Sequence, residues 1–226
     1  MKVSEYINYL VTGECSKLAI SDVGDMSLNP ASGSEPSATQ VLNQNKFINY
    51  VNLSNLAVHK RFHLLQKEVE LDNPLEGEEF KLPDDFLTPI QAYYLTDFEP
   101  VTIKDSYVNI VGAVDSAVSI LIPEPFLAVI KGTDSKKRTP IILKYAAAPT
   151  TATKAAANLK ISEVYTEPLL NYAAYKAHSS ISGDIKDENN TYYLRYEASC
   201  KQVVTSGMWG NNEIEYNSKL IDNGFV

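Results

Sequence analysis

Few residues of this 226-residue chain are of the kinds that build metal or covalent chemistry. There are two cysteines, Cys15 and Cys200, and three histidines. Because the cysteines lie far apart in the sequence, a secreted disulfide framework is not expected, and a reducing cytosolic folding environment fits better. The glycines are scattered, and no phosphate-binding loop, dinucleotide fingerprint, nucleophile elbow or CxxC pair occurs. The sequence therefore predicts no enzyme, no catalytic residue and no cofactor.

Long apolar runs and positive charge are also scarce. No stretch approaches the roughly eighteen apolar residues of a membrane-spanning helix. The first ten residues alternate apolar and polar groups and include Glu5, which is unlike a signal peptide. The net charge of −8 disfavours a nucleic-acid binder, because such proteins neutralise phosphates with Lys and Arg. Negative charge would suit a surface past which DNA only slides.

Apolar residues recur at helical spacing in four segments. We expect helices over residues 3–11, 39–62, 167–181 and 189–206. The apolar stripe of the longest segment is broad, which predicts cover on two sides. Gly13 and Gly207 are placed to end the first and last helices. Thr166 is placed to cap the third helix, with Pro168 in its first turn.

Residues 64–148 alternate between apolar and polar side chains and carry frequent turn signals. Such short strands predict an antiparallel sheet or small sandwich. The expected fold class is therefore α+β, a helical bundle from the N- and C-terminal helices with this β-domain inserted. The predicted parts are an N-terminal helical part (1–63), the inserted β-domain (64–148), a C-terminal helical part (149–207) and a tail (208–226). The loop from Ser21 to Thr39 and the tail are expected to order against neighbouring molecules.

Two groups of residues are candidates for metal or acid–base chemistry. His59 and His63 have the i, i+4 spacing of a zinc helix, but no glutamate lies between them, and surface or packing roles are favoured. Asp84 and Asp85 are adjacent, and after Pro83 they are more typical of a turn or cap than of a paired site. A metal-dependent hydrolase using Asp84, Asp85 and His63 is the last-ranked alternative. The basic run from Lys136 to Arg138 is read as a solvated loop tip, with an electrostatic contact as the alternative.

Tyrosine is unusually frequent, with fourteen in the chain. A tyrosine carries a large apolar ring and a hydroxyl that needs a partner, so tyrosines suit half-buried surfaces and interfaces. The alternative is that they rim the core and bond to water. The residues proposed as a protein interface are Tyr172, Tyr175, Tyr192, Tyr193, Tyr196, Trp209 and Phe225.

Two motifs in their order along the chain resemble a known family. The first is Leu82-Pro83-Asp84-Asp85-Phe86 at the entry to the β region. The second is Tyr175-Lys176-Ala177-His178, followed by the tyrosine-rich helix. Together they resemble the head-to-tail adaptors of short-tailed bacteriophages, also called tail tubular protein A or ring proteins, especially those of crAss-like phages.

The resemblance implies a structural virion protein at the head–tail junction, assembled in the host cytoplasm. It implies a homo-oligomeric ring, typically dodecameric, that docks under the portal, contacts a tail nozzle or further rings, and continues the DNA channel during genome ejection. It implies no cofactor and no membrane partner. We expect acidic side chains to line the channel, because they would repel passing DNA. The alternative is a receptor- or carbohydrate-binding module of a phage tail.

Overall fold

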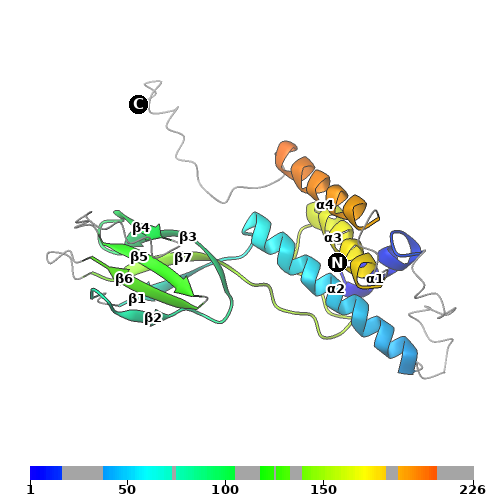
Figure 1. The fold of residues 1–226 in the computed structure, drawn as a ribbon, viewed down its shortest axis with the longest axis horizontal. Coiled ribbons are helices and arrows are strands. Elements are labelled where there is room, and N and C mark those ends of the chain that lie inside the picture. Colours follow the sequence, from blue (N-terminus) through cyan, green and yellow to red (C-terminus); the bar gives the residue numbers. More distant parts are fainter. Residues whose placement is uncertain are drawn as a thin grey trace. The chain divides into compact units, whose positions relative to one another are not determined.

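The computed structural model describes residues 1–16, 38–72, 75–104, 118–124, 126–132, 139–181 and 188–207. Within these residues the chain forms four α-helices, one 3-10 helix and one seven-stranded sheet (Figure 1). The helices are α1 (Val3–Thr12), α2 (Ala38–Phe62), η2 (Glu163–Tyr165), α3 (Thr166–Ile181) and α4 (Glu188–Thr205). The strands are β1 (Gln66–Leu71), β2 (Glu79–Lys81), β3 (Phe86–Tyr94), β4 (Pro100–Lys104), β5 (Ser119–Glu124), β6 (Leu127–Lys131) and β7 (Ile141–Ala147). The predicted α+β class is confirmed.

The chain divides into two compact units. Residues 1–51 and 154–226 form the helical unit, and residues 52–153 form the sheet unit. The division falls within α2, after Val51. The helical unit is therefore built from the two ends of the chain, and the sheet unit from its middle.

In the helical unit, α1 is anchored by the chain that follows the sheet. The backbone N–H groups of Val3 and Ser4 donate to the carbonyls of Ala157 and Ala155, each at 2.9 Å. These bonds satisfy donors that the first turn of a helix leaves without partners. At the other end the N–H of Gly13 donates to the carbonyl of Tyr9, and a Cβ on Gly13 would lie only 2.8 Å from that oxygen. Glycine is therefore required at the predicted end of this helix.

The third helix begins differently from the prediction. Thr166 has helical dihedral angles and follows the 3-10 turn directly, so its assignment as the N-cap is wrong. Pro168 is buried in the first turn, as expected where a missing N–H costs nothing. Gly207 has φ +66°, the left-handed conformation predicted for the residue that ends α4.

Helix α2 is buried on one broad face only. Phe47, Ile48 and Val51 of the helical unit are buried, whereas Leu42 is exposed. In the sheet unit the same helix buries Val58 and Phe62 and exposes Leu53 and Leu56. The prediction that α2 is covered on two sides is therefore wrong within this chain.

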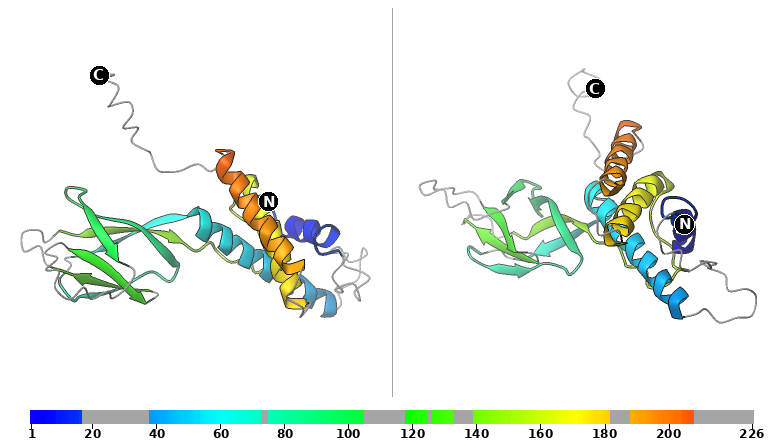
Figure 2. Two further views of the ribbon diagram at one scale, coloured as in Figure 1. Left: turned by 45° about the horizontal axis from the view of Figure 1, so that its top comes forward. Right: turned by 45° about the vertical axis from the view of Figure 1, so that its right-hand side comes forward.

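The sheet has the strand order β1-β7-β3-β4-β5-β6-β2 and curls around its own core (Figures 1 and 2). Large aliphatic side chains from most of the strands meet there, including Leu71, Ile120, Ile130, Ile141 and Leu143. The prediction of a purely antiparallel sheet is wrong at one place, because β4 and β5 pair in parallel. Most of the loop from Ser21 to Thr39 lies outside the described residues, and so does the basic run at 136–138.

Candidate interaction surface

Helices α3 and α4 pack together as an antiparallel hairpin in the helical unit. Asn171 lies opposite Ser199 and His178 lies opposite Tyr192, so the residue numbers rise along one helix as they fall along the other. Three alanines of α3, Ala173, Ala174 and Ala177, are completely buried. Small side chains let neighbouring helices approach closely. The hairpin therefore presents its large side chains at the edges of this contact.

Four of the predicted interface tyrosines form one closed cluster at the α3–α4 contact. The ring centroids of Tyr172 and Tyr175 are 5.7 Å apart, those of Tyr175 and Tyr193 5.3 Å, those of Tyr193 and Tyr196 6.0 Å, and those of Tyr196 and Tyr172 4.9 Å. These separations are typical of attractive edge-to-face and tilted pairs. The Lys176 ammonium lies over the rings of both Tyr172 and Tyr175, at 5.4 and 5.1 Å. The cluster stiffens the hairpin from within the chain.

Tyr192 belongs to a second cluster, which ties the turn after α1 to the hairpin. Its ring stacks on the His178 ring, with the two centroids 4.5 Å apart. The Arg195 guanidinium lies 5.3 Å from the centroid of the Tyr192 ring. The Glu14 carbonyl accepts from the Tyr192 hydroxyl and from His178 Nε2, each at 3.0 Å. The Glu14 carboxylate pairs with Arg195 at 3.1 Å. Burial raises the pKa of the Tyr192 hydroxyl, and the nearby Glu14 raises it further.

The same cluster explains the buried residues around it. His178 is packed and hydrogen-bonded, so its role within the helical unit is structural. Burial raises the pKa of the Cys15 thiol to about 12, so this thiol stays protonated and is a poor nucleophile. Sequence reasoning missed Glu14, because its partners lie between 164 and 181 residues further along the chain.

The outer face of α4 exposes large apolar side chains. Tyr196 is 4% exposed and serves the chain itself, whereas Tyr193 is 42% exposed. Leu194 is 65% exposed and Val204 is 48% exposed. We name Tyr193, Leu194 and Val204 the α4 outer row. Leu194 lies about half a helical turn from the buried Tyr196, and so on the opposite side of α4. An apolar residue on the solvent side of a helix was the signal of this surface that the sequence contained. Trp209 and Phe225 lie outside the described residues.

Asp84 and Asp85 do not form a paired site. Asp84 is exposed and faces Lys81 at 3.7 Å, whereas Asp85 bonds to Lys67 and accepts from the Tyr145 hydroxyl at 3.1 Å. The hydrogen bond from Lys67 holds the pKa of Asp85 below its ordinary value, and burial together with Asp85 raises the pKa of Tyr145 to about 12. The Phe86 N–H donates to the Pro83 carbonyl, so the predicted turn is confirmed.

His59 and His63 also diverge. His59 is buried, and its Nδ1–H donates to the Asn55 carbonyl at 2.9 Å within α2. Burial lowers the pKa of His59. His63 has φ +48° at the end of the helix, the left-handed conformation that more often selects glycine. Within the described residues no group of three or more His, Cys, Asp or Glu side chains is placed to hold a metal ion.

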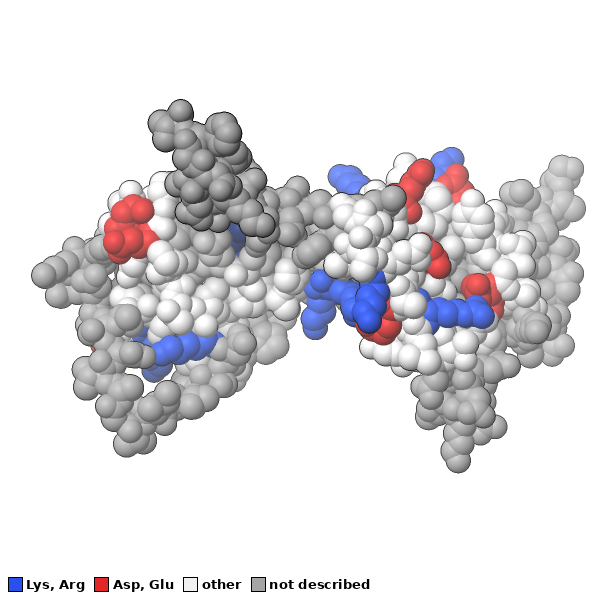
Figure 3. Space-filling model, turned by 90° about the horizontal axis from the view of Figure 1, so that it is seen from above, with Lys and Arg blue, Asp and Glu red and all other residues white. Residues whose placement is uncertain are grey.

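The charged side chains are mixed on the face seen in Figure 3, where described acidic and basic residues lie among uncharged ones. None of the described helices combines the length and apolarity required to cross a membrane.

No protein-family model matches this chain, and no curated protein matches it either. The functional argument therefore rests on the packing and surface described above.

Proposed function

We propose that this protein is a structural subunit that assembles with copies of itself, as the head-to-tail connector ring of a short-tailed phage virion. The α4 outer row is the observation that supports self-assembly. Apolar surface left in water is what an interface between proteins covers. Here three large apolar side chains are exposed on one helix, and the tyrosine cluster stiffens the contact of this helix with α3.

The rigidity of this surface favours tight association. A docking face loses less conformational entropy on binding when its side chains are already held. Tyr193 is held by Tyr175 and Tyr196 within the chain and still exposes part of its ring. Elsewhere on the hairpin, a groove of about 390 Å³ between α3 and α4 is lined by polar groups that include Glu167 and Gln202. Protein interfaces combine apolar and polar surface, and the hairpin offers both.

The finer architecture belongs to the same proposal. In it, α1, the first part of α2, α3 and α4 form a bundle that makes the ring, and the sheet unit is an insertion that reaches other layers of the connector. The ring docks under the portal and its acidic subunits line a channel for DNA. Charge mapped onto an assembled ring tests the channel, because a basic lining would contradict it.

The mass of the purified full-length chain tests self-assembly. We expect sedimentation and native mass spectrometry to find a closed oligomer, and mixing with the portal of the same virus to give a stable complex. Leu194→Glu places a charge in the α4 outer row, and should raise the concentration needed for assembly about tenfold or more. The control is Leu75→Glu, at an exposed leucine of the sheet unit.

Each outcome has a clear meaning. Assembly unchanged by Leu194→Glu contradicts the use of this face, and a wild-type chain that stays monomeric at every concentration, with or without portal, contradicts the proposed function. Equal loss in Leu75→Glu would point to a general effect of charge.

A carbohydrate- or receptor-binding module is the second candidate, because one observation favours it. Phe98 is 70% exposed in the turn before β4, has φ +56°, and pairs with the Tyr93 ring at 5.7 Å. Exposed aromatic faces at the end of a sheet stack well on sugars. If this function holds, Phe98→Ser abolishes retention on host surface glycans while Leu194→Glu leaves it intact. Absence of glycan binding by the wild-type chain rules it out.

A further inference from the structure

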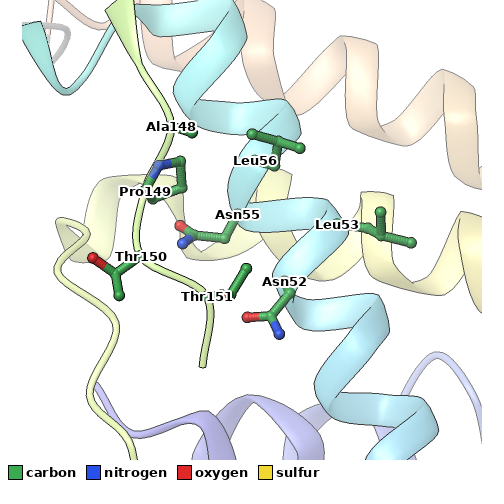
Figure 4. Close-up of a pocket in the computed structure, with 8 residues that line it drawn as sticks. All are labelled: Asn52, Leu53, Asn55, Leu56, Ala148, Pro149, Thr150 and Thr151. Carbon is green, nitrogen blue, oxygen red and sulfur yellow. The ribbon is translucent and has the colours of Figure 1, made fainter. Parts of the chain in front are cut away.

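The sheet unit contains a small apolar hollow between α2 and the chain that leaves β7. Asn52, Leu53, Asn55 and Leu56 form one wall, and residues 148–151 form the other (Figure 4). The Asn52 amide holds these walls together, because it donates to the Ala152 carbonyl at 2.8 Å and accepts from the Ala152 N–H at 2.9 Å. The hollow is therefore built from two fixed pieces of backbone.

The size and lining of the hollow suit one aromatic ring. Its volume is about 170 Å³, and its lining includes Leu56, Ala148 and Pro149, whereas the Leu53 side chain projects away from residues 148–151 (Figure 4). An apolar cavity of about 150 Å³ in a protein binds benzene. Leu56 is an exposed large apolar residue, so an entering ring would cover surface that now faces water.

The polar groups of the hollow indicate a ring that carries a donor. The Asn55 amide projects from α2 toward the opposite wall (Figure 4). Its Oδ1 is buried and has no hydrogen-bond partner among the described residues, and a buried acceptor without a donor destabilises a folded protein. An indole has an apolar body and an N–H that only donates, so it matches both features.

The tail of this chain carries such a group. Trp209 is the only tryptophan of the protein and follows Gly207, where α4 has ended, by two residues. Residues 208–226 contain three acidic side chains and one lysine. On α2, Lys60 is exposed one turn beyond Leu56, and the neighbouring Arg61 is also exposed and positively charged. The acidic tail and the basic end of α2 are therefore complementary.

We propose that this hollow receives the Trp209 indole from the tail of a second copy of the chain. The inference rests on the proposed self-assembly and names one of its contacts. The donor is a tail that follows the helical unit and the acceptor is a hollow of the sheet unit, so the two surfaces differ. Contacts between two different surfaces are heterologous, and they generate rings when the rotation closes.

Tryptophan fluorescence of the full-length chain tests the contact directly, because all indole emission comes from Trp209. We expect emission to shift to shorter wavelength as concentration rises, with the same midpoint as assembly measured by sedimentation. Leu56→Glu should return the emission to that of a solvated indole and raise the assembly midpoint about tenfold. Leu42→Glu is the matched control, since it places the same charge at another exposed leucine of α2.

The outcomes separate this contact from the proposed function. Rings that form normally while the indole stays solvated, or whose shifted emission survives Leu56→Glu, overturn the contact and leave the ring standing. Short-wavelength emission at every dilution means that the tail binds within its own chain, and overturns docking between copies. A monomeric wild-type chain overturns both. Leu56 and Leu42 are exposed, so circular dichroism should show the variants folded, and a variant that unfolds is replaced by Leu56→Ser.

Discussion

The α3–α4 hairpin and the sheet core bury different kinds of side chain. The sheet core is aliphatic, with Ile130, Ile141 and Leu143 fully buried. The α3–α4 hairpin instead buries alanines together with polar groups such as Asn171 and His178. An aliphatic core is complete within one chain, because it needs only volume and exclusion of water. The hairpin gains much less from burial and depends on stacking and hydrogen bonds, and it leaves the α4 outer row uncovered.

This difference assigns different tasks to the units. The sheet unit stabilises itself and can present rigid turns and the hollow beside α2. The helical unit exposes the α4 outer row, and the sheet unit also exposes large apolar residues, including Leu75 and Phe98. The following substitutions test this contrast.

Removing volume from the sheet core should have the largest effect. Ile130→Ala deletes three carbons from a site with no exposed surface, so we expect the free energy of unfolding to fall by about 3 kcal/mol. Denaturant unfolding followed by circular dichroism measures this. Leu75→Ala, at an exposed position of the same unit, should change stability by less than about 0.5 kcal/mol. Similar losses in both would mean that the sheet core is not tightly packed.

Adding volume to the helical hairpin should come next. Ala174 is completely buried, so Ala174→Leu should force the neighbouring helices apart and cost about 2 kcal/mol. Ala198→Leu on the exposed side of α4 is the control. Thermal unfolding of both variants is the measurement, and a neutral Ala174→Leu would contradict close packing of α3.

Removing one hydroxyl from the Glu14 cluster should have a smaller effect. Tyr192→Phe keeps the stack on His178 and loses the bond to the Glu14 carbonyl, which should cost about 1 kcal/mol. Tyr9→Phe removes a hydroxyl from an exposed tyrosine and should be neutral. Hydrogen exchange of the α1 amides would rise only in Tyr192→Phe. Unchanged exchange there would show that this bond does not hold the turn.

The smallest effect is a pH dependence that arises from His59. Burial places its folded pKa below the ordinary value of 6.5, so the unfolded chain takes up the proton first as pH falls. Its contribution is therefore complete above about pH 6.5 and declines below it, until the folded form is also protonated. His59→Gln should flatten this part of the stability curve, whereas His63→Gln should keep it. Parallel curves for the wild type and His59→Gln would show that His59 titrates normally.

Local patterns predicted the elements well. The 3.6-residue period located α2 and α4 to within a residue or two, and alternation located the strands, because each period reflects one buried face. Partners were harder to predict. A strand pattern states that one face is buried but does not name the neighbour, so the parallel pairing of β4 and β5 was missed.

The sequence identified the tyrosine-rich segments but not which of their tyrosines are buried. The tyrosine content indicated half-buried surfaces and interfaces, yet only the antiparallel register of α3 and α4 decides that Tyr196 is buried while Tyr193 stays exposed. The hollow beside α2 was also invisible in the sequence. It depends on Asn52 bonding to Ala152, which lies 100 residues further on.

The Glu14 cluster has a consequence for synthesis on the ribosome. The Glu14 carbonyl, in the turn after α1, is bonded by His178 and Tyr192. These two residues are synthesised only after most of the polypeptide has been translated. The middle of the chain is free to fold early, since domains mature as units during elongation. Nascent chains therefore lack the complete Glu14 cluster until α4 has been synthesised.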